Sequence, residues 1–274
     1  MRIENTGKSS VVLHIDTTDC EYKGNGLYEL TLIDSLLVNK GYHLLVSLAS
    51  AEIPFSFYCV NSYNNKLVYT ENMISKQIII PPGNYSAKSL ANQISNQLGS
   101  ANYTITYNPI DAHYTISTTN EDLETIFDFN ASTCDILLGF DEAGEYILTH
   151  LTPVESNFFV NLNYTNCLYL LTDLTDRGSI DSRTKSTSLI LQKIPINSPP
   201  GNMLYFYNVQ ASHKILFHTN QVQKIQFGLF DDHRRPVELN GQKYQISVLF
   251  DFVDEVQEKY DETQLGGEMN VNIE

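Results

Sequence analysis

The stretch YHLLVSLAS, residues 42–50, is a run of apolar and small residues that ends shortly before Pro54. A short apolar run of this kind between turn residues predicts a β-strand. The same signature recurs along the chain, in segments rich in Tyr, Phe, Ile, Val and Thr, the residues that suit a half-buried pleated surface. We expect further strands around residues 11–15 and at 27–32, 66–69, 77–80, 103–107, 114–118, 158–162, 167–171, 188–194, 203–207, 214–218, 225–230 and 243–251.

One segment has helical rather than strand periodicity. Ser86 follows a Pro-Pro-Gly-Asn-Tyr turn and stands where an N-cap belongs, and Gly99 stands where a helix would end. Between them, apolar residues at helical spacing form a single stripe: Ala87, Leu90, Ala91, Ile94 and Leu98. The pattern predicts a helix over 87–98 that packs on a sheet with one face.

The order of these elements predicts an all-β fold, an antiparallel jelly-roll sandwich. Few helices alternate with the strands, so a parallel α/β sheet is disfavoured. The helix and the hairpin after it predict an inserted helix-plus-hairpin subdomain at 75–151, within a discontinuous sandwich formed by 1–74 and 152–253. Residues 172–187 read as a long polar loop. Residues 254–274 read as an acidic tail, which with residues 1–10 could form arms toward a partner.

Composition excludes several classes of function. The chain has 274 residues and a formal net charge of −15, from 32 acidic and 17 basic residues. Nucleic-acid binding requires clustered Lys and Arg to displace counterions from phosphates, and the sequence has no such cluster. We therefore expect no nucleic-acid partner. We expect no signal peptide, because the sequence starts with the polar stretch MRIENTGKSS. We also expect no direct membrane insertion, because no apolar run approaches the roughly 20 residues of a membrane helix.

The sequence predicts no metal site and no catalytic site. The four cysteines are isolated in sequence, and we interpret them as reduced, mostly buried thiols: Cys20, Cys59, Cys134 and Cys167. No two of the seven histidines are spaced as metal ligands in an H-x-H or H-x-x-x-H pattern. Serine-nucleophile, dinucleotide and phosphate-loop motifs are absent. We therefore predict a protein that is not an enzyme, with no catalytic residue, no cofactor and no metal.

The most charged stretch is Asp231-Asp232-His233-Arg234-Arg235. It could hold a cation or a phosphate, but the pattern favours a solvated turn between two strands, with Pro236 restarting the chain. The adjacent carboxylates Asp141-Glu142 and Asp254-Glu255 could serve a glycosidase only if two carboxyls faced each other across a cleft. With this many acidic residues, adjacent pairs are expected without a function.

Several phrases of the sequence, in order, resemble the minor capsid (penton-like) proteins of large eukaryotic DNA viruses, virophages and polinton-like viruses. The resemblance spans about residues 10–253. It is carried by SAEIPFSFY (50–58), NNKL (64–67), IPPGNYS (80–86) with the following helix, LLGF (137–140), IPI (194–196), LFDD (229–232) and LNG (239–241). Each phrase alone is a short sequence of the kind found in many turns and cores. The resemblance therefore rests on the order and spacing of the phrases.

The resemblance implies a β jelly roll and a structural position in an icosahedral shell, at the vertices if five copies form a penton. It implies location in the virion after assembly inside the host cell, with copies of itself and the major capsid protein as partners. It supplies no catalytic residue. Two other functions stay open: a receptor- or glycan-binding spike, which exposed aromatic residues along a shallow groove would favour, and a hydrolase, which two facing carboxylates would favour.

The distribution of acidic residues suggests which part of the chain contacts a neighbour. Bringing together five copies that each carry −15 costs electrostatic work unless the contacting faces lack acids. Residues 189–230 contain no carboxylate side chain, whereas acids concentrate at 121–145 and after 251. We therefore expect ring contacts through the loops and strand edges of 189–230, and we expect moderate salt to strengthen association by screening repulsion.

Overall fold

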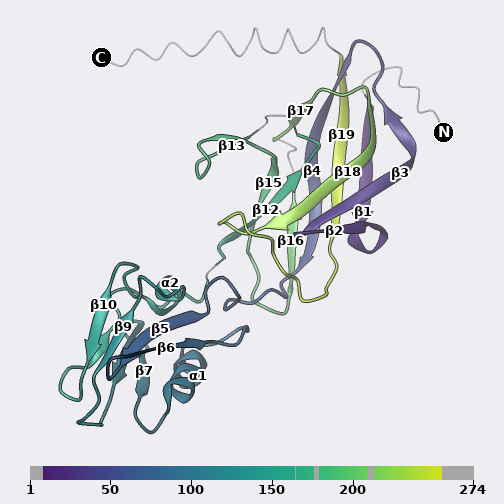
Figure 1. Ribbon diagram of the computed structural model, residues 1–274. Coiled ribbons are helices and arrows are strands. Elements are labelled where there is room, and N and C mark those ends of the chain that lie inside the picture. The colour runs from purple at the N-terminus through teal and green to yellow at the C-terminus, as the bar shows by residue number, and fades with distance from the viewer. Residues whose placement is uncertain (1–8, 164, 176–178, 209–212, 255–274) are drawn as a thin grey trace, which may run out of the picture. The chain divides into compact units, whose positions relative to one another are not determined.

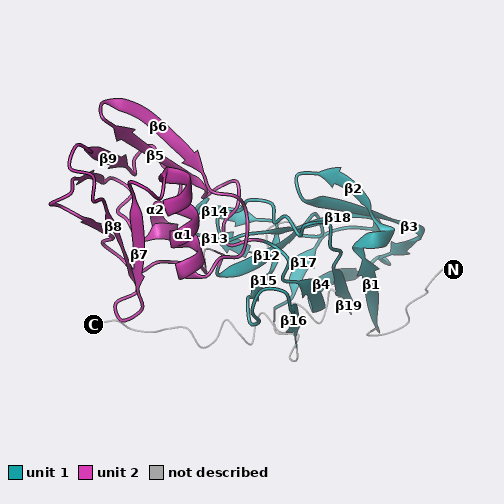
Figure 2. Ribbon diagram, turned by 90° about the horizontal axis from the view of Figure 1, so that it is seen from below, with its two compact units in different colours: residues 1–57, 166–274 teal, residues 58–165 magenta. Residues whose placement is uncertain are grey.

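The computed structural model describes residues 9–163, 165–175, 179–208 and 213–254. The chain forms two compact units, one of residues 1–57 and 166–274 and the other of residues 58–165 (Figures 1 and 2). Each unit has a hydrophobic core of its own. The first unit is a β-sandwich, and the second is inserted between two of its strands.

The first sheet of the sandwich is fully antiparallel and has the order β1-β19-β4-β16, with β17 also pairing β4. β16 and β17 pair with the two ends of β4, so together they cover one side of that strand. The strands are β1 (Ser9–Asp16), β19 (Gln245–Asp254), β4 (Tyr42–Pro54), β16 (Met203–Tyr207) and β17 (Ile215–Phe217).

The second sheet of the sandwich has the order β15-β12-β18-β3-β2 and is also antiparallel. A short 3-10 helix, Thr17–Asp19, joins β1 to β2. The strands are β15 (Ile190–Pro195), β12 (Cys167–Thr172), β18 (Gln221–Phe230), β3 (Leu27–Leu37) and β2 (Glu21–Gly24).

The strand order identifies the sandwich as a jelly roll. Its eight principal strands, in chain order, are β1, β3, β4, β12, β15, β16, β18 and β19. The first, eighth, third and sixth of these form one sheet, and the second, seventh, fourth and fifth form the other. Two four-stranded sheets interleaved in this way are the double Greek key of a jelly roll. The predicted fold class is therefore confirmed.

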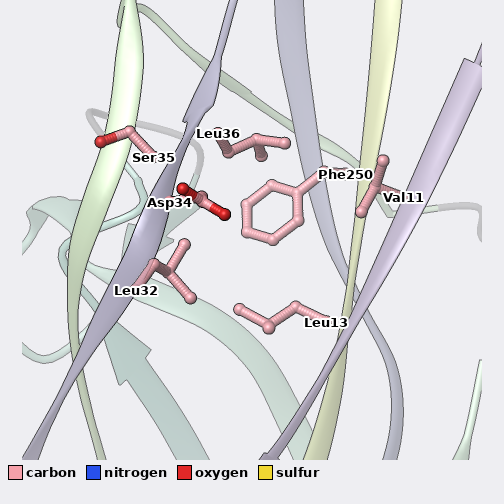
Figure 3. A pocket seen from close by; sticks show the side chains of 7 residues that line it. All are labelled: Val11, Leu13, Leu32, Asp34, Ser35, Leu36 and Phe250. Atoms are coloured by element: carbon pink, nitrogen blue, oxygen red, sulfur yellow. The ribbon is translucent and has the colours of Figure 1, made fainter. Parts of the chain in front are cut away.

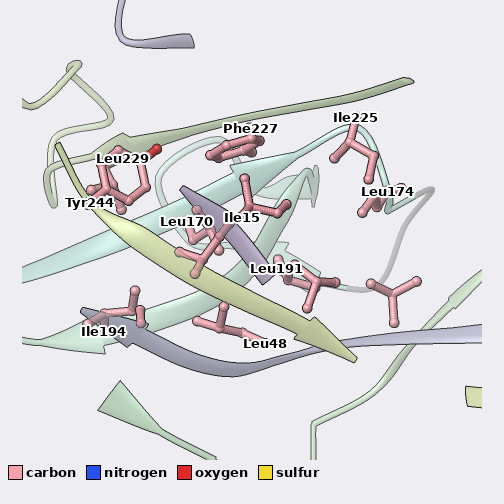
Figure 4. Packing of buried hydrophobic residues seen from close by; sticks show 14 of the residues in the cluster. Ile15, Leu48, Leu170, Leu174, Leu191, Ile194, Ile225, Phe227, Leu229 and Tyr244 are labelled. Atoms are coloured by element: carbon pink, nitrogen blue, oxygen red, sulfur yellow. The ribbon is translucent and has the colours of Figure 1, made fainter. Parts of the chain in front are cut away.

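Alternation of side chains builds the core between the two sheets. Ile15 and Leu48 of the first sheet pack in one cluster with Leu170 and Phe227 of the second (Figure 4). The buried apolar residues of β4 are even-numbered from Leu44 to Leu48 and odd-numbered from Ala51 to Ile53. The change of phase coincides with a shift in register between β4 and β19, which is a β-bulge.

The inserted unit contains two antiparallel sheets. Its four-stranded sheet has the order β10-β9-β5-β6, and its three-stranded sheet has the order β11-β8-β7. The bounds are β5 (Lys66–Glu71), β6 (Ile74–Ile79), β7 (Thr104–Asn108), β8 (His113–Ser117), β9 (Thr125–Asp128), β10 (Glu145–Leu148) and β11 (Val154–Glu155).

Two helices complete the inserted unit, α1 (Ala87–Leu98) and α2 (Asp135–Leu138). α1 confirms the predicted helix at both ends. The hydroxyl of Ser86 accepts from the N–H of Ser89, and the N–H of Gly99 donates to the carbonyl of Ser95. The buried side chains of α1 belong to the predicted stripe: Leu90, Ala91, Ile94 and Leu98. Ala87, the fifth residue of that stripe, is partly buried.

The inserted unit is wider than the 75–151 expected from the sequence, and the sandwich correspondingly narrower than 1–74 with 152–253. β5 pairs with β6 and β9, which draws residues 66–71 into the insertion. β11 pairs with β8, which draws residues 154–155 into it as well. The sequence could not show the pairing of β5 with β9 or of β11 with β8, because these partners lie far apart along the chain.

Two further expectations were wrong. The strand expected at 158–162 is absent, because backbone N–H groups there donate to scattered carbonyls, Phe158 to Gly139 and Val160 to Ala112, rather than to one ladder. Gly139 permits this contact: a Cβ on it would lie 2.2 Å from the Phe158 carbonyl oxygen. Within the expected polar loop 172–187, β13 (Ser179–Asp181) begins a hairpin with β14 (Ser186–Ser188).

Among the described residues, no helix is long and apolar enough to cross a membrane. Asp254, the first residue of the expected acidic tail, ends β19. Residues 255–274, and residues 1–8 of the other expected arm, lie outside the described part of the chain.

Candidate assembly edge and polar sites

One side of the sandwich is formed by the acid-free stretch of the sequence. β15 and β16 are the terminal strands of their sheets on this side, and both fall within residues 189–230. We call this side, residues 190–195 and 203–207, the β15/β16 edge. The stretch 189–230 carries three lysines and no carboxylate, formally +3, which leaves −18 on the rest of the chain.

The β15/β16 edge presents side chains suited to a protein contact. Lys193 is exposed on β15, and the residues Tyr205 and Tyr207 are 50% and 60% exposed on β16. The two tyrosine rings lie nearly parallel, with centroids 6.3 Å apart. Tyrosine is enriched in protein interfaces because it offers a large rigid surface with one polar group. Unpaired strand edges are also the places where a sheet accepts another chain.

A shallow hollow of about 300 Å³ lies on the outer face of the first sheet. Asp16, Gln245, Glu52 and Tyr205 are cross-strand neighbours there, one from each of β1, β19, β4 and β16. Lys243 and Met203 complete the lining. The carboxylate of Asp16 accepts from the Nε2 of Gln245 at 2.6 Å. The hollow therefore combines carboxylates, an amide and an ammonium group with an exposed aromatic ring.

The charged stretch 231–235 is a turn, as expected, but it is not simply solvated. Asp231 is only 5% exposed, and its carboxylate accepts from the backbone N–H groups of His233 and Arg235 and from the Nε of Arg235 at 2.8 Å. Asp181 of the β13–β14 hairpin accepts from the Nε of Arg234 at 2.7 Å. That bond, with one from the N–H of Arg183, lowers the pKa of Asp181.

A second polar cluster lies on β2, β3 and β18. The carboxylate of Glu29 accepts from the Nε2 of Gln226 at 2.9 Å and from the Nζ of Lys224 and of Lys23, each at 3.3 Å. The hydrogen bond from Gln226 and those from the two lysines lower the pKa of Glu29 to about 2. Both clusters join strands or turns that are distant in sequence. Their carboxylates are bonded to cationic and amide groups of the sandwich itself.

One group of potential metal ligands lies in the inserted unit. The Nδ1 of His113 is 3.9 Å from a carboxylate oxygen of Asp111 and 3.9 Å from one of Glu155. The ligand atoms lie within 4.8 Å of one another, but Glu155 is exposed and the other two are half-buried. Sequence spacing could not find this group because Glu155 reaches it only through the pairing of β11 with β8. Exposed acidic groups often gather in this way without binding an ion.

Within the described part of the chain, the other residues singled out in the sequence do not converge on a site; Glu255 of the pair Asp254-Glu255 lies outside that part. Asp141 and Glu142 are exposed in the turn before β10. All four cysteines are free; Cys134 and Cys167 are buried, whereas Cys20 and Cys59 are partly exposed. Burial raises the pKa of the Cys20 thiol, which keeps it in its unreactive protonated form.

No protein family and no curated protein matches this sequence. Among solved structures, the chain is similar to the selenomethionine-labelled penton protein of mavirus, with a TM-score of 0.50 and 10% sequence identity. The match covers 90% of this chain and 100% of the mavirus chain. Since the inserted unit is more than a third of the chain, a match of this extent includes most of it. The protein therefore shares with a viral penton protein the fold of a jelly roll and much of its insertion.

Proposed function

We propose that the protein is a structural component of a viral capsid, a penton or minor capsid protein that assembles at the vertices of an icosahedral shell. The observation that carries this proposal is the extent of the fold similarity, over the whole length of a penton protein. A common jelly roll alone would be weak support, because one fold serves many functions. Similarity that extends into the insertion is more specific.

The charge distribution supports self-assembly into a ring. A head-to-tail ring places one surface of each copy against a different surface of the next. The β15/β16 edge lies in a stretch with no carboxylates, so it can approach a subunit that carries −18 elsewhere without local repulsion. We propose a homopentamer through this edge, with the major capsid protein and other shell proteins as further partners in the virion.

The polar sites support a role other than catalysis. Within the described part of the chain, Asp181, Asp231 and Glu29 are bound to cationic or amide groups of their own unit. Their carboxylates tie together segments of the sandwich. We propose that the protein is not an enzyme and binds no nucleic acid, the latter because of its net charge of −15.

Analytical ultracentrifugation and negative-stain imaging of the purified chain test this proposal. We expect particles of five times 31.1 kDa that appear as five-fold rings. Mass spectrometry of purified virus particles should detect the protein in a fixed ratio to the major capsid protein. A monomer at every protein and salt concentration would contradict self-assembly. Absence of the protein from particles would contradict the capsid role itself.

A second candidate function is glycan binding by the hollow on the first sheet. Its lining offers the combination that sugars use, an exposed aromatic face beside carboxylate and amide groups that accept and donate hydrogen bonds. Saturation-transfer NMR with a panel of oligosaccharides tests it. Binding that is lost in Tyr205→Ala but kept in Tyr22→Ala, which removes an exposed tyrosine of the other sheet, would favour a receptor-binding role.

A further inference from the structure

An apolar groove opens between β1 and β3 in the sandwich. Five of the seven side chains that line it are apolar, and they come from both sheets (Figure 3): Val11, Leu13, Leu32, Leu36 and Phe250. Asp34 and Ser35 complete the lining. The groove measures about 220 Å³, below the roughly 300–1,000 Å³ that is usual for small-molecule sites. It is of a size to take up a few aliphatic side chains.

The local structure explains why the groove is open. β3 carries an irregularity opposite β18, where Thr31 pairs with Lys224 but Leu36 already pairs with Val222. The residues between them bulge from the ladder, and Ile33 there is fully exposed. On the other side of the groove, β1 pairs only with β19 among the strands that the structure describes. Val11 and Leu13 are therefore less buried than Ile15, which follows them on the same face.

A bare strand edge beside an apolar groove is the arrangement to which an additional strand can be added. Main-chain hydrogen bonds along the edge provide affinity, and alternate side chains fill the groove. Side chains of a strand alternate between the two faces of the sheet. On β1, Val12 and His14 face solvent, whereas Val11 and Leu13 line the groove. An added strand should therefore have apolar residues toward the groove, alternating with polar residues toward solvent.

The sequence contains a segment with this pattern. Residues 269–273 read Met-Asn-Val-Asn-Ile, with three apolar residues alternating with two asparagines, directly after Gly266-Gly267 and Glu268. Two successive glycines favour a change of chain direction before a strand. Residues 1–8, which precede β1 directly in the sequence, contain only two apolar residues, Met1 and Ile3.

The segment can reach the groove within the same chain. β19 ends at Asp254, close to the start of β1, because Phe252 pairs with Ser9. The 14 residues 255–268 span up to about 50 Å when extended. β1, with eight residues, is about 27 Å long. A tether of this length holds the segment at an effective concentration on the order of millimolar, which favours the chain's own segment over that of a second copy.

We propose that residues 269–273 of the same chain add a strand to the free edge of β1, with Met269, Val271 and Ile273 in the groove. This strand extends the first sheet and closes the open side of the core. The proposal is independent of the capsid role.

Hydrogen–deuterium exchange tests the occupancy of the edge. Val271→Asp places a charge in the groove, whereas the control Asn272→Asp places the same charge on the outward face of the same segment. We expect Val271→Asp to raise exchange of the β1 amides that point away from β19 by about tenfold or more, and Asn272→Asp to leave it unchanged. Equal exchange in the wild type and both variants would overturn the proposal.

Disulfide trapping tests whether the occupant belongs to the same chain. Val12→Cys is combined with Asn270→Cys or with Asn272→Cys, since outward-facing neighbours on paired strands have Cα atoms within disulfide reach. We expect one of the two pairs to oxidise to an intrachain bond, found by peptide mapping at 31.1 kDa on denaturing, non-reducing gels. A cross-linked species of twice that mass would show that a second copy supplies the segment. That result, or the absence of a bond in both pairs, would overturn the proposal.

Discussion

Arg234 lies over the ring of Tyr169, with its guanidinium carbon 3.6 Å from the ring centre. The same guanidinium donates to Asp181, so one side chain joins β12, the β13–β14 hairpin and the turn after β18. The backbone of Arg234 has a φ of 63°, in the left-handed region that few non-glycine residues adopt. The cation–π contact and the ion pair together hold a local conformation that the backbone alone disfavours.

Loss of the Asp181 charge should destabilise the sandwich. Asp181→Asn keeps the shape of the side chain but leaves the guanidinium of Arg234 without its anionic partner. We expect the free energy of unfolding to fall by about 2 kcal/mol, the usual contribution of a hydrogen bond to a charged group. Urea denaturation measures it. Asp19→Asn removes an exposed carboxylate from the same unit and should cost far less; equal effects would show that the ion pair has no special role.

The stability of the sandwich should depend on pH through Glu29. Its pKa is about 2 in the folded protein, against 4.5 for an ordinary glutamate, so folding favours the charged form. The contribution is fully present above about pH 4.5 and is lost as the pH falls toward 2. Urea midpoints at several pH values should show this loss. Glu29→Gln should flatten the profile below pH 4.5, whereas Glu238→Gln, at an exposed position, should leave the wild-type slope.

A charge on the buried face of α1 should unfold the inserted unit. Ile94 is 1% exposed within the core of that unit, so Ile94→Asp buries a charge without a partner. We expect destabilisation of more than about 3 kcal/mol, since even loss of such a side chain's volume costs 2–5 kcal/mol. Thermal melting followed by circular dichroism detects it. Asn96→Asp, on the exposed face of the same helix, is the control, and wild-type melting of Ile94→Asp would mean that this face is not buried.

Assembly should be sensitive to an acidic residue introduced on the β15/β16 edge. Lys193→Glu places a carboxylate in the stretch that has none and changes the charge of each subunit by two. We expect it to weaken ring formation in sedimentation experiments, and added salt up to about 0.15 M to restore part of it. Lys88→Glu makes the same change of charge on the exposed face of α1. If both variants assemble alike, the contact does not use this edge.

The group Asp111, His113 and Glu155 should hold no resident metal. Its ligands are half-buried or exposed, whereas a structural zinc site encloses the ion with four. Elemental analysis of protein dialysed against buffer without chelator should find far less than one zinc, calcium or iron per chain. One metal per chain that disappears in Glu155→Gln would contradict this prediction and assign a site.

The sequence predicted elements better where one face is consistently apolar. α1 and its caps could be predicted because the stripe from Leu90 to Leu98 keeps helical spacing throughout. β4 extends to Pro54, beyond the end predicted at Ser50. The bulge at its middle changes which residues face inward, so the alternation that starts at Leu44 does not continue after Leu48. The β13–β14 hairpin has almost no apolar face, and its pairing depends on polar contacts such as that of Asp181.

The candidate sites depend on pairings that local patterns do not record. The absence of acids between Leu189 and Phe230 is visible in the sequence, but only the sheet order places β15 and β16 as terminal strands. Likewise, the turn chemistry at Asp231 was evident, whereas its burial and the partnership of Arg234 with Asp181 depend on a hairpin about 50 residues away.

The nesting of one unit within the other fixes an order of events during synthesis. The strands β1, β3 and β4 precede the insertion, and except for the β2–β3 hairpin their partners follow it, the last ending at Asp254. Every strand pair of the inserted unit lies within residues 58–165. At about 5–20 residues per second, the insertion leaves the ribosome complete several seconds before β19 does. The middle of the chain can therefore fold first, while β1, β3 and β4 wait for the partners that are made after it, and a chaperone that delays aggregation would act on residues 9–54.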